Sequence, residues 1–325
     1  MTGIEEYKPR IVAVGGGTGL STLLRGLKAY TPHITAVVTV ADDGGSSGRL
    51  RQDFGILPPG DIRNCILALA DVEPMMERLL RYRFKEGELR GHSLGNLLIT
   101  ALADLSDGFQ PAIHAMSDVL AITGTVYPVT ESNVHLRAHF ADGSGAEGES
   151  SIPVACLQRG TSIERIELVP EYVKPIPEVV NAIMEADAVV LGPGSLYTSV
   201  IPNLLVPGMA QAIHGSKAAC IYIANIMTQP GETDGYDLER HLGAIRDHAG
   251  CDIIDMVLVN NALPSEPILK RYEEEEAYPI PYDRDRLVKK GLKVWDRPLL
   301  DGDSEMGWHD SLRLGHCVLE AAKGL

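Results

Sequence analysis

Near its start the chain reads Ile-Val-Ala-Val-Gly-Gly-Gly-Thr-Gly at residues 11–19, and apolar side chains at helical spacing follow. The β-branched run Ile11–Val14 predicts a buried strand, and Leu20–Tyr30 predicts a helix. A strand, a glycine-rich loop and a helix in this order open many nucleotide-binding α/β units. The loop Gly15–Gly19 therefore predicts an anion site, because its backbone N–H groups can face a phosphate and the helix adds its positive N-terminal end.

The loop matches neither of the two common phosphate-binding fingerprints. A G-x-G-x-x-G motif that starts at Gly15 would place Leu20 in its last position, and one that starts at Gly17 would place Thr22 there. A P-loop needs a lysine directly after its last glycine, and the loop has none. A nicotinamide oxidoreductase is therefore disfavoured, and a tight turn without a ligand is the alternative to a phosphate site.

The rest of the chain repeats this α/β rhythm. A second buried strand is predicted at Ile34–Val40, and others at Ala188–Leu191, Ala219–Ala224 and Ile253–Val259, with amphipathic helices between them. From Thr125 to Val169 the apolar period changes towards two, which predicts a β-rich antiparallel insertion at about residues 125–170. We expect one α/β domain over residues 1–325, built on a doubly wound, mostly parallel sheet. Its ligand should lie at the carboxyl ends of the strands.

Charge and composition exclude several classes of protein. The chain has 29 Lys and Arg against 44 Asp and Glu, a formal net charge of −15, which disfavours binding to nucleic acid or to an anionic membrane. The five cysteines are scattered and form no C-x-x-C pair, as in proteins with reduced thiols. The segment Met1–Arg10 is charged and predicts no signal peptide. We expect a cytoplasmic protein, and self-association into a homo-oligomer is compatible with the sequence.

A second candidate segment, residues 42–51, follows the second predicted strand. It begins Asp-Asp-Gly-Gly-Ser-Ser-Gly-Arg. Carboxylates at the end of such a strand suit contacts with ribose or base, and the glycines, hydroxyls and Arg49 predict a flexible anion clamp. Asp42 and Asp43 also predict a Mg²⁺ site, because that ion is commonly held by one or two carboxylates plus substrate phosphates. A mobile loop without a ligand is the alternative.

The segment Pro58–Asn64 follows the same logic. Asp61 is placed to cap a helix, which is a purely structural role. In the functional alternative Asp61 lies at the same crevice, and Arg63 and Asn64 direct a charge and an amide towards it.

Residues 91–95 match G-x-S-x-G, the nucleophile elbow of α/β-hydrolases. That elbow requires a preceding strand, and the residues before Gly91 do not predict one. Ser93 is more simply a helix N-cap. His92 and Asn96 are then either ligand contacts on the first turn of the helix or buried polar residues.

A second junction of strand, glycine loop and helix is predicted at Gly192–Ser199, with hydroxyl side chains after the glycines. Two such junctions in one sheet predict one long ligand with a pyrophosphate, or two anionic groups. A capped helix without a ligand is the structural alternative. Residues 225–233 follow another buried strand and are expected to add polar contacts, with Asn225 as the candidate residue.

These segments together resemble the CofD-like family, and most closely its YvcK branch, often called gluconeogenesis factors. The resemblance implies a Rossmann-like three-layer fold and a cytoplasmic bacterial protein. It also implies a link to cell shape and cell-wall synthesis on gluconeogenic carbon sources, and binding of UDP-sugars such as UDP-N-acetylglucosamine. The other branch contains the 2-phospho-lactate transferases, which typically carry Ser-Pro-Asp-Leu-Asp near Pro58–Arg63 of this chain. Asp42 or Asp43 matches an aspartate that is tied to acceptor and metal binding in that branch.

The leading hypothesis is a regulator that binds a nucleotide sugar or another nucleotide diphosphate. The alternative is an enzyme, a Mg²⁺-dependent transferase of a substituted phosphate group, with Asp42 or Asp43 as metal ligand and catalytic candidate; the sequence leaves open whether any substrate is turned over. No cofactor other than Mg²⁺ is suggested. The candidate ligand-binding residues are Gly15, Gly16, Gly17, Thr18, Gly19, Asp42, Asp43, Gly44, Gly45, Ser46, Ser47, Arg49, Asp61, Arg63, Asn64, His92, Asn96, Gly192, Gly194, Ser195, Tyr197, Thr198, Ser199 and Asn225.

Overall fold

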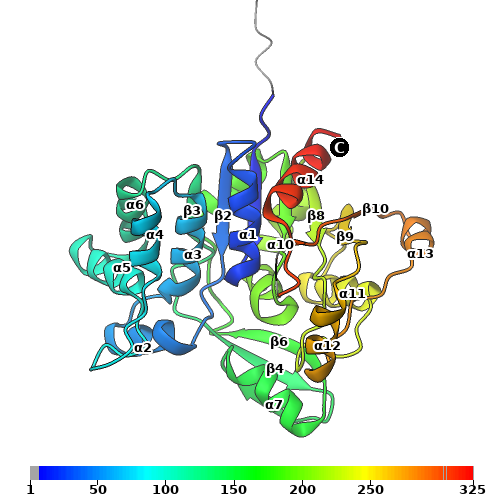
Figure 1. Cartoon of the computed structure of the whole chain (residues 1–325), viewed down its shortest axis with the longest axis horizontal. Coiled ribbons are helices and arrows are strands. Elements are labelled where there is room, and N and C mark those ends of the chain that lie inside the picture. The colour runs from blue at the N-terminus through cyan, green and yellow to red at the C-terminus, as the bar shows by residue number, and fades with distance from the viewer. Residues whose placement is uncertain (1–6, 303, 305, 325) are drawn as a thin grey trace, which may run out of the picture.

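The main sheet has seven parallel strands in the order β10-β9-β8-β7-β1-β2-β3 (Figure 1). The computed structural model describes residues 7–302, 304 and 306–324; most of the segment Met1–Arg10, where no signal peptide is expected, lies outside them. The strands of the main sheet are β1 (Ile11–Gly15), β2 (Ile34–Val38), β3 (Thr125–Pro128), β7 (Ala188–Leu191), β8 (Ala219–Ile223), β9 (Met256–Asn260) and β10 (Lys293–Arg297).

The strand order reverses direction between β1 and β7. Strands β2 and β3 extend the sheet to one side of β1, and β7 to β10 extend it to the other, with β1 paired in parallel to both β2 and β7. The carboxyl ends of β1 and β7 therefore flank a topological switch point, where doubly wound sheets open a crevice for their ligands. The predicted doubly wound fold is confirmed.

Helices cover both faces of the sheet. Because crossover connections are right-handed, α1 and α3 fall on one face, and the helices that follow β7 and β8 fall on the other. The helices of this α/β unit are α1 (Gly17–Leu27), α2 (Gly45–Phe54), α3 (Pro59–Leu69), α4 (Pro74–Arg81), α5 (Leu94–Leu105), α6 (Phe109–Val119), α8 (Pro177–Glu185), the π-helix η1 (Leu196–Val200), α9 (Ile201–Leu204), α10 (Met209–Gly215), α11 (Leu238–Ala249), α12 (Glu266–Glu274), α13 (Arg284–Lys289) and α14 (Ser311–Gly324). None of the described helices is long and apolar enough to cross a membrane.

The predicted antiparallel insertion is present, but it is shorter than expected. It contains β4 (His135–Phe140), β5 (Gly145–Glu147), α7 (Ser151–Arg159) and β6 (Ile163–Val169), and it forms a three-stranded sheet in the order β5-β4-β6. Figure 1 shows this small sheet beyond the carboxyl ends of the main strands. The strand Thr125–Pro128 does not belong to it; β3 is the edge strand of the main sheet. Its alternating sequence reflects burial of every second residue, which the edge position explains.

The segment after β2 is a helix and not the flexible clamp that its composition suggests. α2 begins at Gly45, directly after the turn in which the backbone N–H of Gly44 donates to Asp42 Oδ1 at 2.9 Å. A Cβ on Gly48 would lie 1.9 Å from the carbonyl oxygen of Asp43. This glycine therefore serves a close approach of two backbone segments, and not flexibility.

The first and last helices pack directly against each other, because two glycines meet at their crossing. A Cβ on Gly26 of α1 would lie 1.7 Å from the carbonyl oxygen of Ser311, and a Cβ on Gly315 of α14 would lie 2.5 Å from the carbonyl carbon of Gly26. The C-terminal helix α14 thus fixes the position of α1, whose first turn lies at the switch point.

We predict that Gly26→Ala destabilises the protein by about 1–3 kcal/mol, since the added methyl group has no room in this contact. Gly243→Ala is the matched control, because Gly243 also lies in a helix but its Cβ would have no neighbour within 4 Å. The control should gain stability from better helix propensity. Urea unfolding measures both, and equal effects of the two substitutions would refute the close-packing argument.

Candidate functional site

A polar cleft with a volume of about 640 Å³ lies at the switch point between β1 and β7. Its walls come from the first turn of α1, the Gly194–Ser199 junction, the loop after β8, the insertion and a C-terminal segment. The residues that line it are Gly16, Gly17, Thr18, Gly19, Thr22, Asp42, Asp61, Glu149, Pro153, Pro193, Gly194, Ser195, Ser199, Asn225, Ile226, Met227, Thr228, Gln229, Pro230, Glu232, Tyr272, Glu275, Gly307, Trp308 and His309.

The two glycine junctions lie side by side in this cleft. A Cβ on Gly19 would lie 2.4 Å from the carbonyl oxygen of Pro193, so only glycine allows the two loops to touch here. A Cβ on Gly16 would lie 2.7 Å from Cγ2 of Thr39 and 2.8 Å from Oδ2 of Asp61. The glycines predicted at the first junction thus bring its backbone close to the second junction and to the carboxyl group of Asp61.

The N-terminal end of α1 already holds a carboxylate of the chain itself. The backbone N–H of Gly17 donates to Oδ2 of Asp61 at 2.7 Å. Burial and then the charge of Asp42 raise the pKa of Asp61 to about 6, against the opposing effect of the Gly17 hydrogen bond. Asp61 does not cap its own helix α3, as its position suggested: the N-cap residue is Pro58, and Asp61 lies in the first turn. Its carboxyl group instead lines the cleft and occupies one N–H of the predicted phosphate site.

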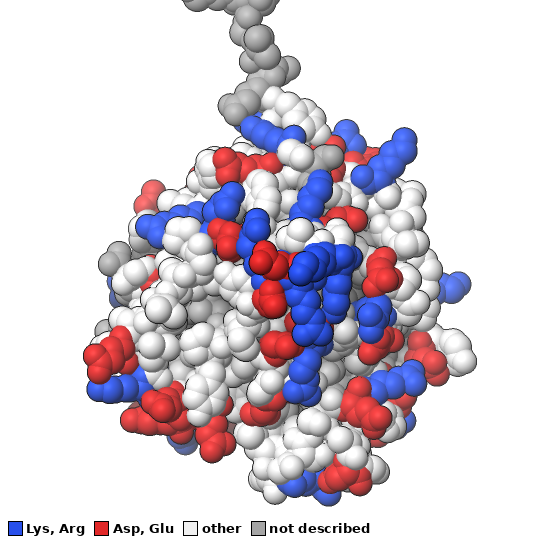
Figure 2. Space-filling view, turned by 90° about the vertical axis from the view of Figure 1, so that its right-hand side faces the viewer, with Lys and Arg blue, Asp and Glu red and all other residues white. Residues whose placement is uncertain are grey.

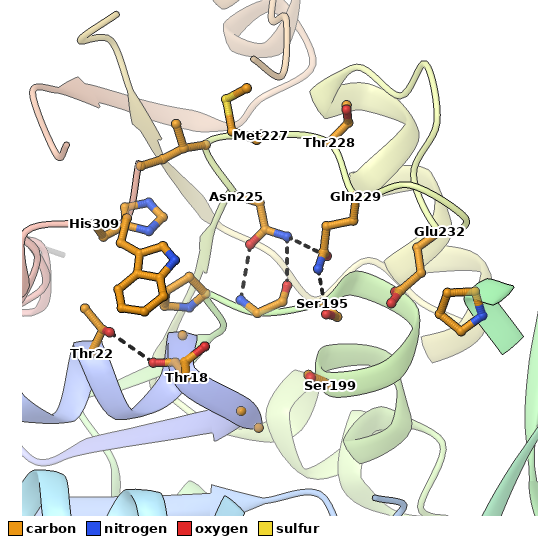
Figure 3. A pocket seen from close by; sticks show the side chains of 18 of the residues that line it. Thr18, Thr22, Ser195, Ser199, Asn225, Met227, Thr228, Gln229, Glu232 and His309 are labelled. Atoms are coloured by element: carbon orange, nitrogen blue, oxygen red, sulfur yellow. Dashed lines mark hydrogen bonds between the residues drawn. The ribbon is translucent and has the colours of Figure 1, made fainter. Parts of the chain in front are cut away.

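A network of side-chain amides holds the second junction. Asn225 follows β8; its Oδ1 accepts from the backbone N–H of Gly194 at 3.2 Å and its Nδ2 donates to the Gly194 carbonyl at 2.9 Å. Gln229 Nε2 donates to Ser195 Oγ at 2.8 Å. Figure 3 shows these side chains together at the base of the cleft, with Thr18 and Thr22 on one side and Glu232 on the other. The network leaves Ser195 and Gln229 with spare hydrogen-bonding capacity towards the cleft.

The carboxylate of Glu232 occupies the N-terminal end of η1, where the sequence predicted an anionic ligand. Its carboxylate accepts from the backbone N–H of Tyr197 at 3.2 Å and from Thr198 Oγ1 at 3.0 Å. Burial raises the pKa of Glu232 to about 7, in spite of these hydrogen bonds. A phosphate cannot take the same N–H group while Glu232 holds it, so Tyr197 and Thr198 shape the junction and do not line the cleft.

Carboxylates dominate the charge of the cleft. Asp42, Asp61, Glu149, Glu232 and Glu275 line it, and no Lys or Arg does so among the described residues. Burial and then the charge of Asp42 raise the pKa of Glu149 to about 8. An anionic ligand would meet a negative potential here unless a cation accompanied it.

The carboxylates fit a divalent cation that also binds ligand phosphates. Among the described residues, no group of three or more His, Cys, Asp or Glu side chains is arranged to hold a metal ion alone. Mg²⁺ usually takes one or two protein carboxylates and completes its shell with water and phosphate. Asp42 and Asp61 supply that number: both line the cleft, and a Cβ on Gly60, the neighbour of Asp61, would lie 3.1 Å from Asp42 Oδ2.

Asp43, the other predicted metal ligand, is engaged elsewhere. Its Oδ1 accepts from the backbone N–H of Ser150 at 3.0 Å and from Ser150 Oγ at 2.7 Å. Asp43 does not line the cleft. It ties the end of β2 to the insertion and so helps to place Glu149, the neighbour of Ser150, at the cleft.

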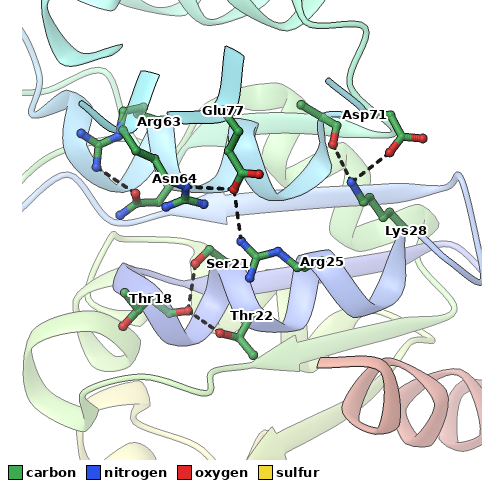
Figure 4. A network of polar contacts seen from close by, with 11 residues as sticks. Thr18, Ser21, Thr22, Arg25, Lys28, Arg63, Asn64, Asp71 and Glu77 are labelled. Carbon is green, nitrogen blue, oxygen red and sulfur yellow. Dashed lines mark hydrogen bonds and ion pairs between the residues drawn. The ribbon is translucent and has the colours of Figure 1, made fainter. Parts of the chain in front are cut away.

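Arg63 and its neighbours form a buried polar cluster beside the cleft. The Arg63 guanidinium donates to Ser93 Oγ, to Asn96 Oδ1 at 2.8 Å and to Asn64 Oδ1 at 2.9 Å. Figure 4 shows Arg63 against Asn64, while Thr18 and Thr22 lie on α1. Ser93 caps α5, as predicted, by accepting from the Asn96 N–H at 3.2 Å. These contacts hold the helices α3 and α5 together, and none of these side chains lines the cleft.

Several other predicted site residues form hydrogen bonds within the chain and do not line the cleft. Ser46 Oγ lies 3.1 Å from His92 Nδ1, and Arg49 donates to the carbonyl oxygen of Arg90 at 2.8 Å. Gly60 N–H donates to Ser47 Oγ. The predicted residues that do not line the cleft are Gly15, Asp43, Gly44, Gly45, Ser46, Ser47, Arg49, Arg63, Asn64, His92, Asn96, Gly192, Tyr197 and Thr198.

The structure adds residues that no sequence pattern singled out. Trp308 and His309 reach the cleft from the segment before α14, and Figure 3 shows His309 on the side of Thr18 and Thr22. Burial lowers the pKa of His309 to about 4, so this histidine is neutral at physiological pH. Glu149 comes from the insertion. Glu232 lies in the segment 225–233 after β8, which was expected to add polar contacts but of which only Asn225 was named as a site residue.

Two comparisons place the chain in a family. A family model described as 2-phospho-L-lactate transferase CofD matches residues 11–300. The chain belongs to the CofD family. The gluconeogenesis factor of Bacillus subtilis is 45% identical over 317 residues, which cover 97% of this chain and 99% of that protein.

Other relatives agree over most of the chain. A relative from Clostridium acetobutylicum is 52% identical over 312 residues, which cover 96% of this chain and 69% of that protein. The crystal structure of a UPF0052 family member from Bacillus halodurans superposes with a TM-score of 0.92 at 45% identity, and covers 96% of this chain and 99% of that one. The resemblance noted from the sequence motifs is therefore confirmed as family membership.

We predict that Glu149→Gln increases the free energy of unfolding relative to the unmodified chain, and that this gain grows between about pH 5 and about pH 8. The pKa of Glu149 rises from 4.5 to about 8 on folding. The unfolded chain then loses its proton first, so folding stability falls with rising pH across this window, by at most about 1.4 kcal/mol per pH unit. Urea unfolding at a series of pH values measures the difference.

Glu147→Gln is the matched control. The side chain of Glu147 is exposed, and its hydrogen bond with Arg137 lowers its pKa. Its hydrogen bond with Arg137 is fully formed above the ordinary range of a carboxyl group, so the control should lose stability slightly and show no gain over the same window. A flat pH profile for Glu149→Gln would show that the Glu149 carboxyl is not destabilised at the cleft.

Proposed function

We propose that this chain is a cytoplasmic regulator that binds a nucleotide sugar of the UDP-N-acetylglucosamine type in the cleft. By this proposal it supports cell shape and cell-wall synthesis on gluconeogenic carbon sources. Its membership of the CofD family and its similarity to gluconeogenesis factors over nearly its whole length support the regulatory role. The motifs that resemble the YvcK branch support the choice of ligand.

The observation that carries the proposal is that the first turn of α1 lies next to uncharged polar side chains at the bottom of the cleft. The N-terminal end of a helix favours negative charge, and Thr18 adds an exposed hydroxyl there. Next to it, Ser195, Asn225 and Gln229 present hydroxyl and amide groups. A diphosphate over α1 and a sugar over the amides would use both surfaces, because neutral amides and hydroxyls are suitable partners for sugar hydroxyl groups.

The charge of the cleft requires a cation in this complex. Neither Arg49 nor Arg63, the arginines expected to neutralise phosphate, lines the cleft. Mg²⁺ held by Asp42 and Asp61 would neutralise carboxylates and phosphates at once. Burial and then the charge of Asp42 disfavour the charged form of Asp61, and a cation bound between the two carboxylates would offset the second of these effects.

Trp308 supplies a flat apolar surface on which the nucleobase of the ligand can stack. Its side chain is 49% exposed although it lines the cleft, together with Tyr272. Base stacking on an aromatic ring tolerates any base, so this contact supports a nucleotide and does not select uracil.

The first test is calorimetric titration with UDP-N-acetylglucosamine. We predict that binding depends on Mg²⁺ and weakens by roughly tenfold or more in its absence. Without the cation, the ligand phosphates and the carboxylates of the cleft repel each other, and this repulsion exceeds the roughly 1.4 kcal/mol that corresponds to a tenfold change in affinity. Asp42→Asn should abolish most of the response to Mg²⁺. The control Asp53→Asn changes an exposed aspartate on α2 outside the cleft and should leave it intact. Absence of heat with folded protein and Mg²⁺ would refute the proposal.

The second test addresses the stacking of the nucleobase on Trp308. We predict that Trp308→Ala weakens the binding of the same ligand by about five- to one-hundred-fold, the range expected for the loss of one stacking contact. Tyr172→Ala is the control, because Tyr172 is 90% exposed and lies outside the cleft. Equal affinities of the two variants would place the base elsewhere.

A transferase is the second candidate function, and the pair Asp42 and Asp61 favours it. In such a reaction an acceptor hydroxyl would attack a phosphorus of a nucleoside diphosphate donor. The bond to the leaving nucleotide phosphate would break, and a carboxylate would take the hydroxyl proton. Release of nucleoside monophosphate that depends on Mg²⁺ and on an acceptor would establish turnover. A ligand recovered unchanged after prolonged incubation would support the regulator.

A further inference from the structure

A basic segment interrupts the acidic surface at the far edge of the main sheet. Residues 284–297, from the start of α13 to the end of β10, contain six Lys and Arg but only two Asp, in a chain whose net charge is −15. Figure 2 shows Lys and Arg side chains gathered in a continuous band on this face. We call Arg284, Arg286, Lys289, Lys290 and Lys293 the basic rim.

The cations of the basic rim are only partly neutralised. Glu239 on α11 accepts from both Arg286 and Lys290, at 2.8 and 2.5 Å, so one carboxylate serves two cations. Lys289 and Lys293 are exposed and have no carboxylate within ion-pair distance among the described residues. Lys289 and Lys293 therefore add positive charge without an ion pair here, although Asp252 and Asp255 share a surface hollow with Lys293.

A groove lined by both aliphatic and charged side chains lies directly beside the basic rim, between α11 and α13. It has a volume of about 410 Å³. Leu242, Ile254 and Leu292 line it together with Glu239, Arg246, Asp252 and Lys290, so its aliphatic surface lies among two acidic and two basic side chains. The groove shares no lining residue with the polar cleft.

We propose that the groove and the basic rim dock an acidic peptide segment of another protein, with an apolar side chain of that segment in the groove. Charge complementarity is the reason for this choice of partner: a segment rich in Asp and Glu would be attracted by the surplus cations, while most of this protein would repel it. The recessed aliphatic side chains of the groove suit a protruding apolar anchor, which a peptide offers and a phosphate backbone lacks. A membrane would instead need several apolar groups that protrude from this face, and α13 exposes a single one, Val288.

Gly243 gives a clean way to close the groove. It lines the groove within α11, and a Cβ built on it would have no neighbour within 4 Å. Gly243→Leu should therefore fill the groove without strain, and the better helix propensity of leucine should keep the protein folded. This variant tests the groove independently of charge.

The experiment selects short random peptides, displayed on phage, against the full chain, and measures the binding of the enriched peptides by fluorescence polarisation. We expect enrichment of Asp and Glu around a Leu, Ile or Phe. Gly243→Leu and the charge reversal Lys289→Glu/Lys293→Glu should each weaken binding by roughly tenfold or more. The control Lys85→Glu/Lys174→Glu reverses two exposed lysines outside the groove and the basic rim and should bind as the unmodified chain does.

Three outcomes would overturn the proposal. Enriched peptides without an acidic bias would remove the charge argument, and equal binding to Gly243→Leu would remove the groove. Self-association that rises with protein concentration and is lost in Lys289→Glu/Lys293→Glu would identify a second copy as the partner, with its acidic run Glu273–Glu276 as a natural counterpart. Sedimentation velocity measures this last outcome without any peptide.

Discussion

The central constraint in this structure is that the chain's own carboxylates accept hydrogen bonds from backbone N–H groups of both glycine junctions, the groups expected to bind a ligand phosphate. Asp61 holds the N–H of Gly17 at the start of α1, and Glu232 holds the N–H of Tyr197 at the start of η1. Each bond resembles the contact that a phosphate oxygen would make at a helix N-terminus. The junctions are thus organised without a ligand, and the number of N–H groups left for a ligand is correspondingly smaller.

This arrangement determines how a charged ligand could enter the cleft. The buried carboxylates repel one another, which contributes to the raised pKa values of Asp61 and Glu149. A bare diphosphate would increase that repulsion, whereas a complex with Mg²⁺ would reduce it. The cleft is consequently better suited to a metal–diphosphate complex than to a free anion. The neutral amides of Asn225 and Gln229 remain outside this charge balance and suit an uncharged part of the ligand.

The sequence could predict the parts of the site that depend on backbone, and it missed those that depend on long-range packing. Gly19 signals the contact of the two junctions, because only glycine fits against Pro193. The sequence predicts that Arg63 directs its charge towards the crevice, and only the positions of Ser93 and Asn96 show that it is held between α3 and α5 instead. Trp308 lies more than a hundred residues from either junction, and no local pattern connects it to them. β10 was missed because its charged sequence, Lys-Val-Trp-Asp-Arg, reflects an edge strand.

A regulator must connect what it binds with what it contacts, and the fold provides a physical route between the two proposed sites. η1, which Glu232 caps, continues into α9, and α9 packs against α11. α11 in turn forms one wall of the groove beside the basic rim. The buried hydrogen bond between the hydroxyls of Tyr197 and Tyr236 joins η1 to the loop just before α11 a second time. A ligand that displaced Glu232 from the start of η1 would therefore disturb a segment bonded to the wall of the groove. Contiguity alone does not create coupling, but any coupling must appear with equal magnitude at both sites, since binding free energies are reciprocal.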